Sequence, residues 1–376
     1  MIYLDNSATT KVDERVVEEM LPFLYNQYGN PSSKHYTLAT KSENAVEKSR
    51  KQLADLLNCN PKELIFTGGA TESNNFIIKG IADYYKDKGN HIITSSIEHK
   101  SVLETCEFLE KKGFNVTYLS PNKNGKISPN KIKKEISDET ILISIMWGNN
   151  ELGTLNNINK IAQITKEKNA LFHTDATQVL GKIEVDANQI PFDFLSCSAH
   201  KIHGPKGIGA TFIRTNDLGF RKKITPLLHG GEQEYNLRAG TLSVHNIVGM
   251  GKAAEIATKE MKDYIPKISN LDNFFKNKLN KINTDIVFNG SQKNKIPGII
   301  NVTIPGINNE FFIKKLKDEL AISTGSACSI TEPSHVLQEI GLSEQEIMAT
   351  LRISLSKYNT CNDITSLIKH LEQFIF

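Results

Sequence analysis

Two polar segments, each directly after an apolar run, carry an acid and a lysine that could act on one small molecule. Residues 171–173 lead into Asp175, and residues 192–195 lead into a segment that contains Lys201. In open α/β sheets, ligands bind beyond the carboxyl ends of the strands. One helical crossover fits between the two runs, so we expect Asp175 and Lys201 to end neighbouring strands and face one crevice.

A glycine turn offers an anion site nearby. Residues 68–69 are both glycine, follow a strand-like run at 64–66 and precede a helix-like run from about Ala70 and Thr71. A helix N-terminus presents unpaired N–H groups and a partial positive charge, which suits a phosphate. Taken alone, the turn is more typical of an ordinary capped helix, with Thr71 and Ser73 satisfying the first N–H groups.

An acid, a lysine and a phosphate turn are together the groups that pyridoxal 5'-phosphate requires. The lysine amine forms a Schiff base with the aldehyde, and the carboxylate keeps a proton on the pyridine nitrogen so that the ring accepts electrons. Singly, Lys201 is typical of a solvated surface cation and Asp175 of a helix N-cap. Their order and spacing favour the cofactor.

Short motifs along the whole chain resemble those of one enzyme family. They are ATESN from Ala70, EHK from Glu98, NNELG from Asn149, HTDATQ from His173, SAHK from Ser198, RAGT from Arg238 and GSAC from Gly325. They resemble the signature of the cysteine desulfurases of the NifS/IscS branch, which are class V aminotransferase-like, fold type I enzymes dependent on pyridoxal 5'-phosphate. The resemblance runs from Tyr3 to Ser354.

The resemblance implies a role for each of several cofactor-binding residues. Lys201 would carry the cofactor, Asp175 would pair with its ring nitrogen, and His99 would stack on the ring and assist proton transfer. Asn149 and Gln178 would hydrogen-bond the phenolic oxygen, and Asn149 would also contact the substrate. The groups that would hold the phosphate are Ala70, Thr71, Ser198, His200 and, from the other subunit of a homodimer, Thr241.

Two further residues would act on the substrate, L-cysteine. Cys328 would take its sulfur as a persulfide, leave L-alanine and pass the sulfur to an acceptor protein. The small residues at 323–329 favour an exposed loop around Cys328, whereas the other four cysteines lie in apolar or helical contexts that favour burial. Arg352 would bind the substrate carboxylate through its planar guanidinium, or else form a salt bridge within a small C-terminal domain.

Several alternatives remain open at this point. A related class V aminotransferase or a selenocysteine lyase would share the fold, and a non-catalytic sulfur-relay subunit could retain it. Desulfurases of this kind supply iron–sulfur cluster assembly, tRNA thiolation and DNA phosphorothioation, and the sequence does not distinguish these acceptors.

The elements that must position these residues follow an α/β pattern. Residues 42–58 predict an amphipathic helix. Short apolar runs predict buried strands at 91–94, 116–119, 141–147, 171–173, 192–195 and 210–213. We expect a large α/β cofactor domain at 14–257 with a mainly parallel sheet flanked by helices. A smaller α+β domain would combine 1–13 and 258–376, with a long helix at about 252–282 and strands near 299–304.

Composition excludes several other classes. The 376 residues carry a net charge of only +3, too little for a dedicated nucleic-acid binder, so no direct nucleic-acid binding is expected. Apolar runs are too short to span a membrane, and the N-terminus lacks a secretion signal, which predicts a cytoplasmic protein. The five cysteines form no CxxC pair, so neither a disulfide framework nor a metal site is indicated.

Overall fold

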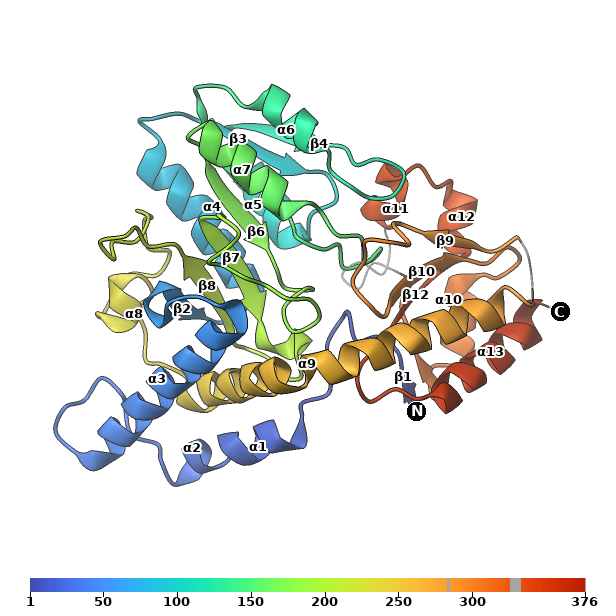
Figure 1. The fold of residues 1–376 in the computed structure, drawn as a ribbon, viewed down its shortest axis with the longest axis horizontal. Helices are drawn as coiled ribbons and strands as arrows, with labels where there is room; N and C mark the ends of the chain where they lie inside the picture. Colours follow the sequence, from blue (N-terminus) through green and yellow to red (C-terminus); the bar gives the residue numbers. More distant parts are fainter. Residues whose placement is uncertain (283–284, 325–332, 376) are drawn as a thin grey trace.

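The computed structural model describes residues 1–282, 285–324 and 333–375 (Figure 1). Its larger part is built on a seven-stranded sheet with the order β2-β8-β7-β6-β5-β3-β4. Neighbouring strands are parallel except where β8 pairs with β2 and β7. The strands are β2 (Leu64–Thr67), β3 (His91–Ser95), β4 (Asn115–Leu119), β5 (Thr140–Ser144), β6 (Leu171–Asp175), β7 (Phe194–Ser198) and β8 (Gly209–Ile213). The predicted mainly parallel α/β sheet is confirmed.

Both faces of this sheet are covered, which explains why its strands read as continuous apolar runs. Leu64 and Phe66 belong to one buried cluster and Ile65 to another, because successive side chains point to opposite faces. The covering helices include α3 (Thr37–Leu57), α4 (Ala70–Tyr85), α5 (Lys100–Glu110), α6 (Pro129–Glu135), α7 (Ile158–Glu167) and α9 (Val244–Leu279). The shorter α1 (Glu14–Met20) and α2 (Pro22–Tyr25) pack on α9, and α8 (Gln233–Asn236) lies beside β2.

The connection between β6 and β7 differs from the prediction. The two strands are parallel neighbours, as expected, with Asp175 opposite Ser196. The predicted helical crossover is wrong, however, because residues 176–193 form turns closed by bonds such as Val179 N–H to the Ala176 carbonyl at 3.0 Å. These turns connect the end of β6 to the start of β7, so the carboxyl ends of the two parallel strands lie at the same edge of the sheet without a helix between them.

The C-terminal part forms a separate α+β unit with the start of the chain. Its antiparallel sheet has the order β12-β10-β9, and β1 pairs with β11 in parallel. A core of its own joins Leu4 to Phe275, Val302 and Ile353. The elements are β1 (Ile2–Tyr3), β9 (Val287–Asn289), β10 (Ile299–Thr303), β11 (Leu320–Ala321), β12 (Thr350–Ser354), α10 (Asn309–Lys315), α11 (His335–Glu339), α12 (Glu344–Met348) and α13 (Cys361–Ile375).

Helix α9 links the two parts as one continuous helix (Figure 1). It passes through position 257, where the sequence predicts the boundary between the domains. The proposed division into 14–257 and 1–13 with 258–376 therefore places this boundary inside a helix rather than in a loop. None of the helices within the described ranges is both long and apolar enough to cross a membrane.

A buried ion pair anchors the strand that leads into the glycine turn. Arg50 donates to both carboxylate oxygens of Glu234, at 2.8 and 2.7 Å, and to the Leu64 carbonyl at 2.9 Å. Glu234 in turn accepts the Phe66 N–H at 2.6 Å. Glu234 holds a left-handed backbone conformation, with φ of 48°, which the surrounding contacts must stabilise. This pair fixes β2 directly before the turn.

We predict that Glu234→Gln lowers the free energy of unfolding by about 3–5 kcal/mol, because it leaves the buried Arg50 guanidinium with only the exposed Glu47 carboxylate, at 3.1 Å, as a counter-charge. Urea denaturation of the purified protein measures the change. The control is Glu19→Gln, which breaks an exposed pair with Lys48 and should cost less than about 1 kcal/mol. Equal losses in the two variants would contradict the role of the buried pair.

Candidate active site

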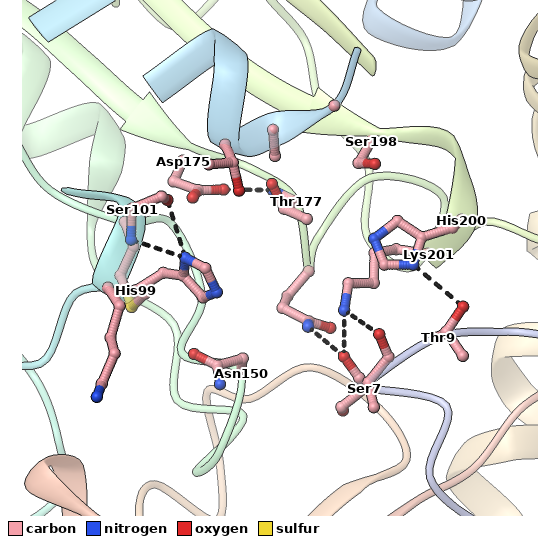
Figure 2. Close-up of a pocket in the computed structure, with 18 of the residues that line it drawn as sticks. Ser7, Thr9, His99, Ser101, Asn150, Asp175, Thr177, Ser198, His200 and Lys201 are labelled. Atoms are coloured by element: carbon pink, nitrogen blue, oxygen red, sulfur yellow. Dashed lines mark hydrogen bonds between the residues drawn. The ribbon is translucent and has the colours of Figure 1, made fainter. Parts of the chain in front are cut away.

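One cavity of about 680 Å³ lies at the carboxyl ends of β6 and β7 (Figure 2). It brings together most of the residues predicted from the sequence, which are Ala70, Thr71, His99, Asp175, Gln178, Ser198, His200, Lys201 and Arg352. Asn149 and Thr241 do not line it. Cys328 lies outside the described residues.

Asp175 provides the acid of the cavity from the last position of β6. Its Oδ1 accepts the Thr177 N–H at 2.9 Å, and its Oδ2 accepts from Asn74 Nδ2 at 2.8 Å. The carboxyl group is buried, with 7% of the residue exposed. Two donors on opposite oxygens fix the plane of the carboxylate and leave further lone pairs for a ligand N–H.

Lys201 follows β7 in the short 3-10 turn η2 (Ala199–Lys201). Its ammonium donates to the carbonyls of Ser7 and Ala8 at 2.5 and 2.6 Å, and Gln178 Nε2 donates to the same Ser7 carbonyl at 2.9 Å. The N-terminal segment therefore forms one wall of the cavity (Figure 2). Lys182 donates to Gln178 Oε1 at 3.1 Å, and burial, with the nearby positive charge of Lys201, lowers the pKa of Lys182 to about 7.

The glycine turn is shaped as an anion cradle rather than as a capped helix end. Gly69 precedes α4 with φ of 149°, a conformation that favours glycine, and provides no side-chain cap. Ser73, the alternative capping residue, instead bonds the Thr67 hydroxyl at 2.8 Å. A Cβ at Gly209 would lie 2.7 Å from Gly69 Cα, so the turn also depends on a second glycine. The first N–H groups of α4 thus face the cavity at Ala70.

Ser198 and His200 complete the cradle on the side of β7. The Ser198 hydroxyl donates to the Ile208 carbonyl at 3.3 Å, and His200 Nδ1 lies 3.1 Å from the Thr9 hydroxyl. Burial, reinforced by the positive charge of Lys201, lowers the pKa of His200 to about 4. His200 is therefore neutral near pH 7 and can offer a ligand at the cradle a hydrogen bond but no charge.

His99 enters the cavity from the N-cap position of α5. Its Nδ1 accepts the Ser101 N–H at 3.1 Å and lies 2.8 Å from the Ser101 hydroxyl. Burial is the main cause that lowers the pKa of His99, with Asp175 opposing it and Lys201 and His335 adding to it. The imidazole is therefore neutral at pH 7.

The structure places Asn150, not Asn149, at the cavity. The Asn149 side chain is buried in its own turn, where Oδ1 accepts the N–H groups of Glu151 and Leu152, both at 2.9 Å, and Nδ2 donates to the Ile97 carbonyl at 3.1 Å. These bonds leave it no access to the cavity, contrary to the role expected from the sequence. Asn150, the next residue, lines the cavity instead.

Arg352 forms the salt bridge expected as its alternative role, and it also lines the cavity. It lies on β12 with 1% of the residue exposed, and it lines the cavity. Its Nη2 pairs with Asp5 Oδ1 at 2.7 Å, and its Nη1 donates to the Asn150 carbonyl at 3.4 Å. The ion pair holds the guanidinium in place at the cavity wall, where it can meet a carboxylate.

The cysteines in the described residues follow the sequence prediction only in part. Cys106 and Cys197 are buried, and burial raises the pKa of each thiol to about 12. Cys59 is half-buried. Cys361 is exposed at the start of α13, so the expectation of burial is wrong there: a first-turn helical position leaves the side chain in solvent.

Sequence reasoning also missed several cavity residues, namely Ser7, Ala8, Thr9, Ser101, Asn150 and His335. Ser7 and Ala8 act through backbone carbonyls, which no residue type reveals. His335 lies far along the chain and reaches the wall because its Nε2 bonds the Glu98 carbonyl at 3.1 Å. Among the residues that the structure covers, no cluster of His, Cys, Asp or Glu could hold a metal ion.

Comparisons with known proteins match nearly the whole chain. The aminotransferase class V family matches residues 2–367. Cysteine desulfurase IscS of Salmonella paratyphi B is 44% identical over 367 residues, which cover 96% of this chain and 90% of that protein. A solved NifS-like protein has a TM-score of 0.92 and 36% identity, covering 99% of this chain and 98% of its own. SspA in complex with cysteine has a TM-score of 0.82 and 39% identity, covering 96% and 100%.

The two adjacent asparagines give a direct test of the site geometry. We predict that Asn149→Ala lowers the free energy of unfolding by about 2 kcal/mol or more, because it leaves buried N–H groups of the turn without an acceptor. Asn150→Ala should change stability by less than about 1 kcal/mol. Urea denaturation without added ligand measures both, and a larger loss for Asn150→Ala would contradict the assignment.

Proposed function

The chain belongs to the aminotransferase class V family, and we propose that it converts L-cysteine to L-alanine as a cysteine desulfurase with pyridoxal 5'-phosphate. The resemblance to NifS and IscS proteins is confirmed by 44% identity over almost the full length. One observation carries the proposal: Lys201 and Asp175 line one cavity beside an uncapped helix N-terminus. That is the donor set the cofactor needs.

The residues at the cavity fit pyridoxal 5'-phosphate in charge and in position. The phosphate would be held by the first N–H groups of α4 at Ala70 and Thr71, with Ser198 and His200. Asp175 would bind the ring nitrogen, Lys201 the aldehyde carbon, and Gln178 with Asn150 the phenolic oxygen.

The buried hydroxyls of Thr177 and Ser7 have no hydrogen-bond partner in the described part of the chain, which leaves them available to a ligand. When bound, the cofactor supplies an electron sink for substrate carbanions.

The chain's own side chains would bind and orient the substrate. Arg352 would take its carboxylate, since the Asp5 ion pair already holds the guanidinium at the cavity. Lys201 Nζ would take the proton from the substrate Cα, and His99 lines the same cavity as a second group that holds a proton.

We propose that Cys328 completes the reaction as nucleophile. Its thiolate attacks the substrate sulfur, so that the S–S bond of a persulfide forms as the substrate Cβ–S bond breaks. The electron pair of the broken bond stays with the amino acid, which takes up a proton and leaves as L-alanine. The sulfur then passes from Cys328 to an acceptor protein. A free thiol of this kind persists in a reducing compartment, consistent with a cytoplasmic enzyme.

We further propose a homodimer in which the partner subunit's Thr241 contacts the phosphate. Thr241 is exposed and does not line the cavity of its own chain, although it shares a loop with Arg238, which pairs with Glu72 of the cradle at 2.9 Å. Sedimentation equilibrium should give twice the chain mass, and a monomer that retains full activity would contradict the proposal.

The assignment of Cys328 is tested by two matched cysteine variants. Cys328→Ala should reduce sulfide and alanine formation from L-cysteine by roughly 10³-fold, because the sulfur loses its nucleophile, while cofactor absorbance is retained. Cys361→Ala removes an exposed thiol far along the chain and should leave the rate unchanged. Turnover by Cys328→Ala at the wild-type rate would instead favour a related lyase or aminotransferase.

A further inference from the structure

We infer that Ser101 and Asn74 are positioning residues that hold His99 with its proton on Nε2, so that the imidazole presents a hydrogen-bond donor to the cavity. No motif in the sequence indicated this role for either residue. The state of His99 follows from hydrogen bonds within the chain, while its consequence for catalysis rests on the proposed desulfurase function.

The first step is the contact at His99 Nδ1. The backbone N–H of Ser101 lies 3.1 Å from this nitrogen and can only donate. Nδ1 must therefore accept, and in a neutral imidazole the proton is then on Nε2. His99 is the N-cap residue of α5, so this bond also satisfies one of the first N–H groups of the helix.

The second step is the direction of the Ser101 hydroxyl. Asn74 Nδ2 lies 2.8 Å from Asp175 Oδ2, and a carboxylate only accepts, which fixes the orientation of the Asn74 amide. The same amide nitrogen lies 2.9 Å from Ser101 Oγ, so Ser101 accepts there. Its own O–H remains for His99 Nδ1 at 2.8 Å. Nδ1 thus receives two donors, and Asp175 sets the direction of the whole series.

Burial hinders water from replacing the hydrogen bonds that run from Asp175 through Asn74 and Ser101 to His99. Asn74 is fully buried and Ser101 is 8% exposed. Protonation of Nδ1 would break the bond from the Ser101 N–H, and the Ser101 hydroxyl would have to turn its O–H away from Asn74 and His99 and accept from both. The charged or titratable groups that act on His99 from the neighbouring elements are Asp175, Lys201 and His335. Asp175 favours the charged imidazole, and the two donors on Nδ1 oppose it.

His99 and Lys201 would therefore have different roles in the reaction. A neutral imidazole with Nε2–H stabilises negative charge by donating a hydrogen bond, but it cannot accept a proton at that nitrogen. His99 would therefore stabilise negative charge that develops in the cavity, and transfer of the Cα proton would fall to Lys201. Asp175 would both bind the cofactor and, through Asn74 and Ser101, keep His99 as a hydrogen-bond donor.

The test is a long-range 1H–15N NMR spectrum of protein labelled with 15N-histidine, recorded with and without pyridoxal 5'-phosphate. His99→Gln identifies the His99 signals by their loss. The expected result at pH 7 is an Nε2–H neutral imidazole in both samples. An Nδ1–H form or an imidazolium would overturn the inference. Cofactor binding is read separately by absorbance, so a protein without bound cofactor but with the Nε2–H form would contradict only the proposed function.

Ser101→Ala separates this positioning role from a merely structural one. Loss of one donor to Nδ1 should raise the pKa of His99 by roughly one pH unit in the NMR titration. The acid limb of kcat/KM should move to higher pH by the same amount, because His99 must stay neutral. Ser101→Thr retains the hydroxyl and should restore the wild-type profile. Asn74→Ala should shift the pKa in the same direction, which keeps the test valid if one variant fails to fold.

The matched control is Ser96→Ala. The Ser96 hydroxyl donates to Glu339 at 2.6 Å and does not contact His99. It should leave the His99 pKa and the pH profile unchanged. An equal shift in Ser96→Ala and Ser101→Ala would overturn the proposed role of Ser101, as would a Ser101→Ala titration identical to that of the wild type.

Discussion

The parallel pairing of β6 with β7 is the constraint on which the site depends. Because parallel strands end at the same edge of a sheet, Asp175 at the end of one strand and Lys201 just beyond the other must share a cavity. The turns at 176–193 connect the two parallel strands, as a helical crossover would. The chemistry thus follows from strand order and register.

The N-terminal segment joins the two halves of the site. Carbonyls of Ser7 and Ala8 hold Lys201, while Asp5 holds Arg352 on the sheet of the C-terminal part. Asn6 Nδ2 donates to the Ser354 carbonyl at 2.7 Å and fixes this segment against β12. A few residues at the start of the chain therefore set the distance between the lysine proposed to bind the cofactor and the arginine proposed to bind substrate.

The sequence predicted the elements and groups whose position follows from local pattern. Buried strands read as apolar runs, and Asp175, Lys201 and the glycine turn follow such runs directly. It did not distinguish Asn149 from Asn150, because two identical residues in one turn differ only in which way the backbone points them. The state of His99 was also hidden, since it depends on hydrogen-bond directions set by Asn74 from another element.

The central claim is that Lys201 holds pyridoxal 5'-phosphate in this cavity opposite Asp175. Borohydride reduction of the loaded enzyme, followed by peptide mass spectrometry, tests it most directly. The account predicts the mass of the reduced cofactor on the peptide that contains Lys201 and its loss in Lys201→Ala. Attachment to the half-buried Lys182, or no attachment to any lysine in enzyme with full desulfurase activity, would contradict it.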